Sequence, residues 1–217
     1  MNDRHSPRVI ALIDALIDGG PMQGYLSQCR VKAIHEDDNV SVPPTAEEVA
    51  LLVDYLERHK ASPTIVGSVG VLLQLRARDK KAEFRPTVDV DIWVKRVPPL
   101  LPGWRLDVES IGVTSWISPS GGHVDFLTAG DSLPSGEDVP KVITRDAQLG
   151  RGPFPVASMA DLLKLKLNSW REKDFADAIA LVKANGGLAS LAMGKLNKVQ
   201  RDNLDLVIKW LVATQQA

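Results

Sequence analysis

The chain has 217 residues, of which 44% are hydrophobic and 24% are charged, and its formal net charge is −1. This composition is typical of a globular protein with a substantial core, and the near-neutral charge excludes a bulk electrostatic attraction to nucleic acid. The single cysteine excludes an internal disulfide framework, and no apolar run approaches the roughly 20 residues that span a bilayer. Because the N-terminus also lacks a signal-peptide pattern, we expect a cytoplasmic protein with no membrane partner.

The first part of the chain alternates helical patterns with polar, irregular sequence. Apolar spacing predicts a helix over residues 7–18. Residues 21–44 are polar and end in two prolines, so we predict a loop there. Thr45 followed three positions later by Glu48 is a capping box, which predicts a helix over residues 46–60.

The middle of the chain is rich in strand patterns. We predict a short strand over 64–66, a turn at Gly67 and Ser68, a helix over 69–78, and a strand over 88–95. Further short strands are predicted at 104–110, 112–118, 123–128, 140–144 and 154–157.

The last part of the chain returns to helical spacing. Ser158 can cap a helix through Asp161, and a second helical stretch follows and ends at Gly186 and Gly187. A third amphipathic helix is predicted over residues 199–214. Its apolar side is expected to contain Leu204, Val207, Trp210 and Leu211.

This order of elements predicts an α+β fold, with a mixed β-sheet flanked by helices, added N-terminal helices and a helical C-terminal part. We divide the chain into an N-terminal helical extension over 1–44, an α/β core over 45–157 and a C-terminal helical region over 158–217.

Two carboxylates stand on one face of the predicted strand 88–95. Asp89 and Asp91 alternate with apolar residues, so they lie about 6.6 Å apart at Cα on the same side of the strand. Like charges so placed repel each other, and Mg²⁺, which takes oxygen ligands, would offset that repulsion. The alternative is a polar, solvent-facing strand face that neighbouring charges such as Arg85 and Lys95 balance.

A third carboxylate lies in the predicted strand 123–128. Asp125 sits between Val124 and Phe126, and three carboxylates from two neighbouring strands would form a two-metal centre for phosphoryl displacement. A surface aspartate is the alternative. His123 would share the face of Asp125, where we interpret it as a structural or supporting histidine.

The Gly67–Ser68 pair precedes a predicted helix. The N-terminus of a helix favours a phosphate, and a glycine lets the backbone approach it closely. The alternative is an ordinary turn and helix cap.

Several separated motifs together resemble the DNA polymerase beta-type nucleotidyltransferase superfamily. The fuller pattern is similar to the bacterial abortive-infection (AbiEii-like, type IV toxin) nucleotidyltransferases, over roughly residues 60 to 185. The matching residues are Gly67-Ser68, Arg85-x-Thr87-x-Asp89-Val90-Asp91, Asp125, Lys166-Leu167, Arg171 and Lys173-Asp174-Phe175-Ala176-Asp177.

This resemblance implies a set of catalytic carboxylates. Asp89, Asp91 and Asp125 would bind two Mg²⁺ ions, and Asp125 would also help to activate the acceptor hydroxyl.

The resemblance also implies a set of nucleotide-binding residues. Gly67 and Ser68 would hold the β- and γ-phosphates of a nucleoside triphosphate such as ATP, and Lys166 would neutralise triphosphate charge. Asp177 would orient that lysine or the base, and Arg85 would either position the strand or touch the nucleotide.

The implied reaction moves a nucleoside monophosphate from a nucleoside triphosphate to a hydroxyl acceptor. The acceptor would be an RNA 3′ end such as tRNA, or a protein side chain, and the enzyme would be a toxin with an antitoxin partner. One alternative is a small-molecule nucleotidyltransferase of the aminoglycoside-modifying type, which predicts an acidic cleft. Another is a non-catalytic nucleotide-binding or interaction module, which predicts that at least one aspartate points away from the others.

An RNA acceptor predicts a basic surface beside the carboxylates. The candidate residues for this surface are Arg76, Arg78, Lys80, Lys81, Arg171 and Lys173.

Overall fold

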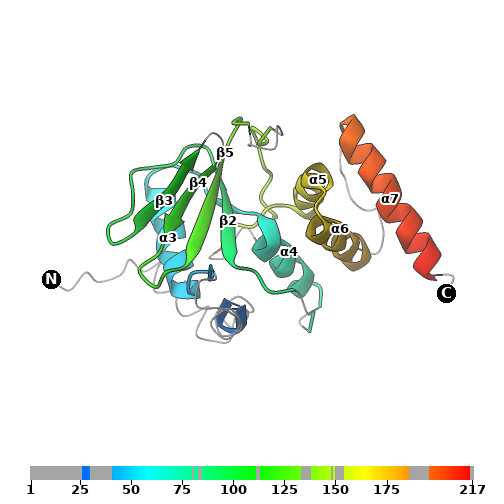
Figure 1. Cartoon of the computed structure of the whole chain (residues 1–217), viewed down its shortest axis with the longest axis horizontal. Helices are drawn as coiled ribbons and strands as arrows, with labels where there is room; N and C mark the ends of the chain where they lie inside the picture. Colours follow the sequence, from blue (N-terminus) through cyan, green and yellow to red (C-terminus); the bar gives the residue numbers. More distant parts are fainter. Residues whose placement is uncertain are drawn as a thin grey trace.

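The structure of the protein is a computed structural model that describes residues 26–29, 41–79, 81–82, 85–110, 113–132, 138–147, 149, 154–185 and 196–215. Its centre is a five-stranded sheet with the strand order β1-β2-β5-β4-β3 (Figure 1). The strands are β1 Thr64–Ile65, β2 Asp89–Val94, β3 Arg105–Ser110, β4 Val113–Ile117 and β5 His123–Thr128. The helices with labels are α3 Ala46–Arg58, α4 Gly67–Arg76, α5 Met159–Ser169, α6 Glu172–Ala184 and α7 Lys198–Gln215.

The sheet is mixed, because β2 and β5 run parallel while the other neighbouring strands pair antiparallel. A parallel pair needs a long connection between its strands. Here that connection contains β3 and β4, which continue the sheet beyond β5. The predicted α+β class with a mixed sheet is therefore confirmed.

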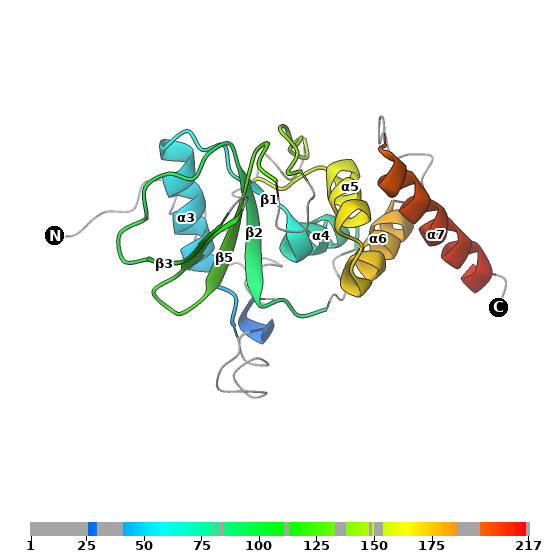
Figure 2. The same ribbon diagram turned by 45° about the horizontal axis from the view of Figure 1, so that its top comes forward.

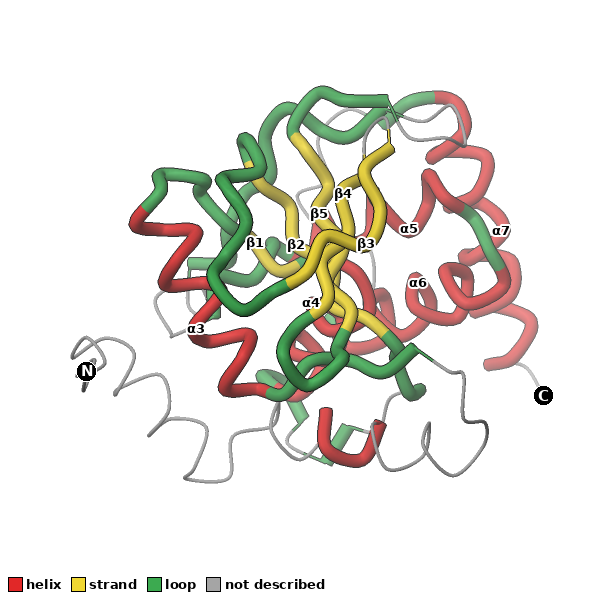
Figure 3. Tube along the Cα trace, turned by 60° about the vertical axis from the view of Figure 1, so that its left-hand side comes forward, coloured by secondary structure: helices red, strands yellow, loops and turns green. Residues whose placement is uncertain are grey.

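Helices lie on two sides of the sheet (Figures 2 and 3). On one side, apolar side chains of α3 share a buried cluster with Val90, Ile92 and Phe126 of the central strands. On the other side, α4, α5, α6 and α7 build a second cluster that reaches the sheet at Trp93. The sequence indicated that β2 buries only the face opposite Asp89 and Asp91. Trp93 lies on the same face as these aspartates, yet it is only 3% exposed because these helices cover it.

The capping signals in the sequence correctly mark where two helices begin. Thr45 and Glu48 form the expected capping box at α3, with backbone–side-chain distances of 2.8 and 3.2 Å. Ser158 caps α5 by accepting a hydrogen bond from the backbone N–H of Asp161. The strands predicted at 88–95, 104–110, 112–118 and 123–128 are also confirmed, each to within a residue or so at its ends.

The predicted strand 140–144 is wrong. This segment forms no strand, because its backbone groups form hydrogen bonds with side chains. The carbonyl of Pro140 accepts from the Trp93 indole, and the N–H of Thr144 donates to Asp161. The segment 154–157 contributes only isolated bridges, from Val156 to Ile65 and from Ala157 to Arg145.

Two other boundaries differ from the prediction. The turn expected at Gly67 and Ser68 is instead the first turn of α4. Within the predicted loop 21–44, residues 26–29 are helical and Val42 forms a bridge with Gly122. The predicted helix 7–18 lies outside the described residues, as do Gly186 and Gly187, so only the end of α6 at Ala184 is seen.

Helix α7 confirms the predicted C-terminal helix, although its apolar side is only partly covered. Val207 is buried and Leu204 and Leu211 are partly buried, whereas Trp210 is 38% exposed and packs its ring against Phe175. No helix in the described part of the chain is both long and apolar enough to cross a membrane. The domain boundaries stay a prediction.

Candidate functional site

The three predicted aspartates meet at one place on the sheet. In the parallel register of β2 and β5, Asp91 lies directly beside Asp125, and Asp89 lies beside His123. Because side chains alternate along a strand, Asp89, Asp91 and Asp125 all point to the same face. All three line a single cavity of about 470 Å³. None of the three therefore points away from the other two.

The opposite walls of this cavity come from helices. The N-terminus of α4 contributes Gly67 and Ser68, and α5 contributes Lys166 near its end. The junction between α5 and α6 contributes Arg171 and Lys173. The site thus combines the sheet with both sets of helical motifs that the sequence singled out.

Gly67 is required by its contact with Asp91. Its φ of +59° lies in the left-handed region that favours glycine. A Cβ at this position would also overlap the Asp91 carboxylate. The start of α4 and the middle of β2 are therefore in direct contact, and the glycine makes that contact sterically feasible.

The carboxylates carry negative charge that no cation in contact offsets. Among the described residues, none of the three lies within ion-pair distance of a lysine or arginine. Burial, together with repulsion from Asp89 and Asp125, raises the pKa of Asp91 to about 7. Burial also raises the pKa of Asp125, although the hydrogen bond from Ser115 opposes that rise.

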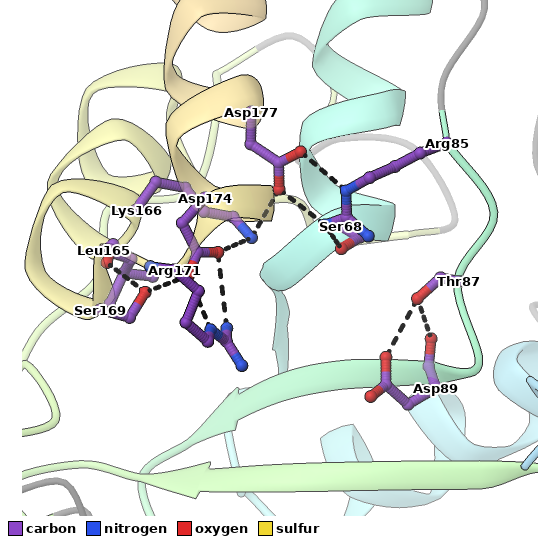
Figure 4. Close-up of polar contacts among 10 residues, drawn as sticks. All are labelled: Ser68, Arg85, Thr87, Asp89, Leu165, Lys166, Ser169, Arg171, Asp174 and Asp177. Atoms are coloured by element: carbon purple, nitrogen blue, oxygen red, sulfur yellow. Dashed lines mark hydrogen bonds and ion pairs between the residues drawn. The ribbon is translucent and has the colours of Figure 1, made fainter. Parts of the chain in front are cut away.

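Two hydroxyl groups orient the carboxylates. Thr87 Oγ1 donates to Asp89 Oδ1 at 3.0 Å (Figure 4), and Ser115 Oγ donates to Asp125 Oδ1 at 2.5 Å. Because each hydroxyl engages one oxygen, the other oxygen of each carboxylate has no side-chain donor among the described residues.

The donor chemistry of the aspartates suits a hard divalent cation. All three supply carboxylate oxygens, the ligands that Mg²⁺ prefers in proteins. As the side chains stand, no three histidine, cysteine, aspartate or glutamate residues in the described ranges are grouped to hold one ion. A metal shared by all three carboxylates would therefore need at least one of them to rotate.

A network of opposite charges extends from the helical wall of the cavity into the protein (Figure 4). Lys166 Nζ lies 2.9 Å from Asp174 Oδ1 and 2.7 Å from Asp177 Oδ2. Lys166 is 5% exposed, and both aspartates are fully buried. Arg171 binds the other oxygen of Asp174 at 2.7 Å. Although burial raises the pKa of Asp174, the hydrogen bonds from Arg171, Lys166 and Ser169 hold it well below its ordinary value.

Arg85 joins this network to the start of α4. Its guanidinium binds both oxygens of Asp177, at 3.1 and 2.9 Å, and also donates to Ser68 Oγ at 2.6 Å. Arg85 and Asp177 do not belong to the cavity lining, whereas Ser68 and Lys166 do. The structure therefore places Arg85 and Asp177 behind the wall that they support, and their predicted contact with nucleotide stays a prediction.

Other residues of the site were not singled out by the sequence reasoning. Ser115 is one, because an isolated serine in a strand carries no signal until its partner strand is known. Lys173 was named in the motif pattern and in the predicted RNA-binding patch but was given no role in the site, yet it lines the cavity beside the carboxylates.

That predicted basic patch is divided by the structure. Arg171 and Lys173 line the cavity, near the beginning of α4. Arg76, Arg78 and Lys81 lie at or beyond the other end of this ten-residue helix, about 15 Å away by its rise. Lys80 lies outside the described residues.

His123 occupies the same sheet face as Asp125 but does not line the cavity. Its Nδ1 lies 3.5 Å from Asp107 Oδ2 on β3. The buried tryptophans Trp93, Trp104 and Trp116 belong to the two apolar clusters and do not line the cavity.

No protein-family model matches this chain, and no curated protein is significantly similar to it. The resemblance to nucleotidyltransferases therefore stays a prediction that rests on the motif residues of the sequence.

Proposed function

We propose that this protein is a Mg²⁺-dependent nucleotidyltransferase that moves a nucleoside monophosphate from a nucleoside triphosphate to a hydroxyl acceptor. The observation that carries the proposal is the meeting of Asp89, Asp91 and Asp125 in one cavity beside the glycine start of α4. Three carboxylates that face one cavity repel one another, and a bound cation would offset that repulsion. This convergence favours a catalytic centre over a non-catalytic module of the same fold.

The three aspartates would have different roles in this reaction. Asp89, Asp91 and Asp125 would hold Mg²⁺, which when bound polarises phosphoryl oxygens and lowers the pKa of an attacking hydroxyl. Asp125 Oδ2, the oxygen that Ser115 leaves open, accepts the proton of the acceptor hydroxyl. The acceptor oxygen then bonds to the α-phosphorus, the bond from that phosphorus to the β-phosphate oxygen breaks, and pyrophosphate leaves.

The N-terminus of α4 suits the phosphate tail in this reaction. Gly67 keeps the backbone close to Asp91, and the first residues of α4, Gly67 and Ser68, line the cavity. The unpaired N–H groups of a helix N-terminus favour a phosphate at such a place. Ser68 adds a hydroxyl that Arg85 holds in place. The acceptor is expected to be an RNA 3′ end such as tRNA or a protein side chain, with a small molecule as the alternative.

The proposal is tested by incubating the purified protein with Mg²⁺, each of the four α-labelled nucleoside triphosphates and total cellular RNA. We expect label in RNA or on protein with the wild type, and a loss of at least about a thousandfold with Asp89→Ala, because removing a metal ligand removes transition-state stabilisation. Asp107→Ala is the matched control, since Asp107 lies on the same sheet but outside the cavity lining.

Each outcome of this test has a distinct meaning. Label in RNA names the acceptor class and the preferred base together, whereas label on the protein identifies a side-chain acceptor. Equal transfer by wild type and Asp89→Ala would refute the two-metal centre. An absence of label in every reaction, combined with no binding of nucleotide, would refute the proposed function.

A further inference from the structure

Three cationic side chains line the cavity wall that faces the carboxylates, and they differ in how far they are already engaged. Lys166 has two carboxylate partners, Asp174 and Asp177. Arg171 has one, Asp174. Lys173 has no ion-pair or hydrogen-bond partner among the residues that the structure describes.

Lys166 is poorly suited to receive a phosphate in this arrangement. Lys166 is 5% exposed, and its ammonium group makes ion pairs of 2.7 and 2.9 Å with two buried aspartates. Turning it toward a ligand would take a donor away from the buried carboxylates of Asp174 and Asp177, which is unfavourable. Lys166 therefore serves best as a fixed charge that joins α5 to α6.

Lys173 has the opposite properties. It is exposed, it lies in the first turn of α6, and it lines the cavity together with Asp91. It is also close enough to Asp91 that its charge acts to lower the pKa of that carboxylate. An exposed lysine can reach a ligand without giving up an existing contact.

We propose that Lys173, rather than Lys166, contacts the phosphate tail of the nucleoside triphosphate, an inference that rests on the proposed function. The α-phosphate must lie at the carboxylates, where transfer occurs, so the β- and γ-phosphates extend toward a cationic wall. Lys173 is the lysine of that wall, within the described ranges, whose charge is not already matched by a carboxylate in contact. A lysine acts on phosphate as a mobile point charge, which suits a tail that must leave as pyrophosphate.

The test is equilibrium binding of Mg²⁺-nucleoside triphosphate and of the matching nucleoside monophosphate, measured by calorimetry without any acceptor. We expect Lys173→Ala to weaken triphosphate binding by about tenfold or more and to leave monophosphate binding nearly unchanged, because charge-assisted contacts contribute about 1.5–3 kcal/mol. Lys173→Arg should restore most of the triphosphate affinity. Lys209→Ala, which removes an exposed lysine from α7, is the matched control and should change neither affinity.

The opposite results would overturn the inference. An equal loss of affinity for both nucleotides would assign Lys173 a structural role. Normal triphosphate binding by Lys173→Ala, with more total RNA needed to half-saturate its transfer reaction, would assign Lys173 to the acceptor. If the wild type binds and transfers nucleotide but Lys173→Ala binds triphosphate normally, this inference fails while the proposed function stands. If the wild type neither binds nor transfers nucleotide, both fail.

Discussion

The two walls of the cavity treat charge in opposite ways. On the sheet, Asp89, Asp91 and Asp125 lie together, and no lysine or arginine among the described residues is in ion-pair contact with them. Burial and the repulsion from Asp89 and Asp125 raise the pKa of Asp91 to about 7. On the helices, Lys166 and its partners alternate in sign, and the pKa of Asp174 falls well below its ordinary value.

The difference in charge pairing separates residues that stabilise the fold from residues that are suited to bind a ligand. In the network around Lys166, each buried charge has a partner of opposite sign, so the network is stable without a ligand. Removing one member leaves a buried charge with fewer partners of opposite sign. A cluster of like charges is costly by itself and gains from a cation. Buried charge alone therefore does not identify a binding site, whereas unmatched buried charge does.

The largest expected effect comes from breaking the matched network. Lys166→Met should lower the free energy of unfolding by about 3–5 kcal/mol, because Asp174 and Asp177 would then lack their shared partner. Urea unfolding followed by circular dichroism measures this. Lys164→Met is the control on the same helix, since the more exposed Lys164 only approaches Asp161 at 3.6 Å, and it should cost less than about 1 kcal/mol. Equal losses in the two variants would contradict the comparison.

The second effect is a pH dependence that belongs to the unmatched cluster. The pKa of Asp91 is raised from an ordinary value of 3.8 to about 7, so between these values the folded protein binds more protons than the unfolded chain. Without divalent cations, stability should therefore fall as the pH rises from about 4 to about 7, by about 2–4 kcal/mol relative to Asp91→Asn. Urea unfolding in a chelating buffer at several pH values measures the difference.

Divalent cation supplies the control for this pH effect. Mg²⁺ should stabilise the wild type at pH 7.5 and reduce the difference from Asp91→Asn, because it binds the ionised cluster. If, without metal, the free energies of unfolding of the wild type and of Asp91→Asn changed with pH in the same way, the repulsion between the carboxylates that the structure indicates would be refuted.

The smallest expected effect tests the contact between Gly67 on α4 and Asp91 on β2. Gly67→Ala should destabilise the protein by about 2 kcal/mol more than Gly121→Ala, because both positions have positive φ but only the Cβ at Gly67 meets Asp91. The Cβ at Gly121 has nothing within 4 Å, so that variant reports backbone strain alone. Thermal unfolding of both variants measures the difference, and equal melting temperatures would mean that Asp91 can withdraw freely.

Much of the sheet and of the carboxylate cluster could be predicted from sequence. The alternation around Asp89 and Asp91 fixes their common face, and Asp125 is flanked by Val124 and Phe126, which are buried in the α3-side core. The predicted strand 140–144 failed because it pairs with no strand in the described part of the chain. Ile143 joins the apolar cluster of α5, the carbonyl of Pro140 accepts from Trp93, and Val142 is exposed.

The division of roles among the cations could not be predicted. Lys166 and Lys173 both belong to motif segments, and sequence spacing gives no measure of which one the aspartates of α6 will engage. That choice depends on how α5 and α6 pack around Trp170, a left-handed residue at their junction with a φ of +41°. Tertiary packing determines which lysine the aspartates bind. From the sequence alone, Lys173 could therefore be placed only in a motif and in a predicted RNA-binding patch.

The parallel pairing of β2 with β5 has a consequence for how the protein acquires its shape. Asp91 and Asp125 are separated by the whole of β3 and β4 along the chain, and they become neighbours only when the two central strands join. Long-range parallel contacts close large loops, so they are expected to form late and slowly. The carboxylate cluster would thus form only with the step in which β5 joins β2 and completes the sheet.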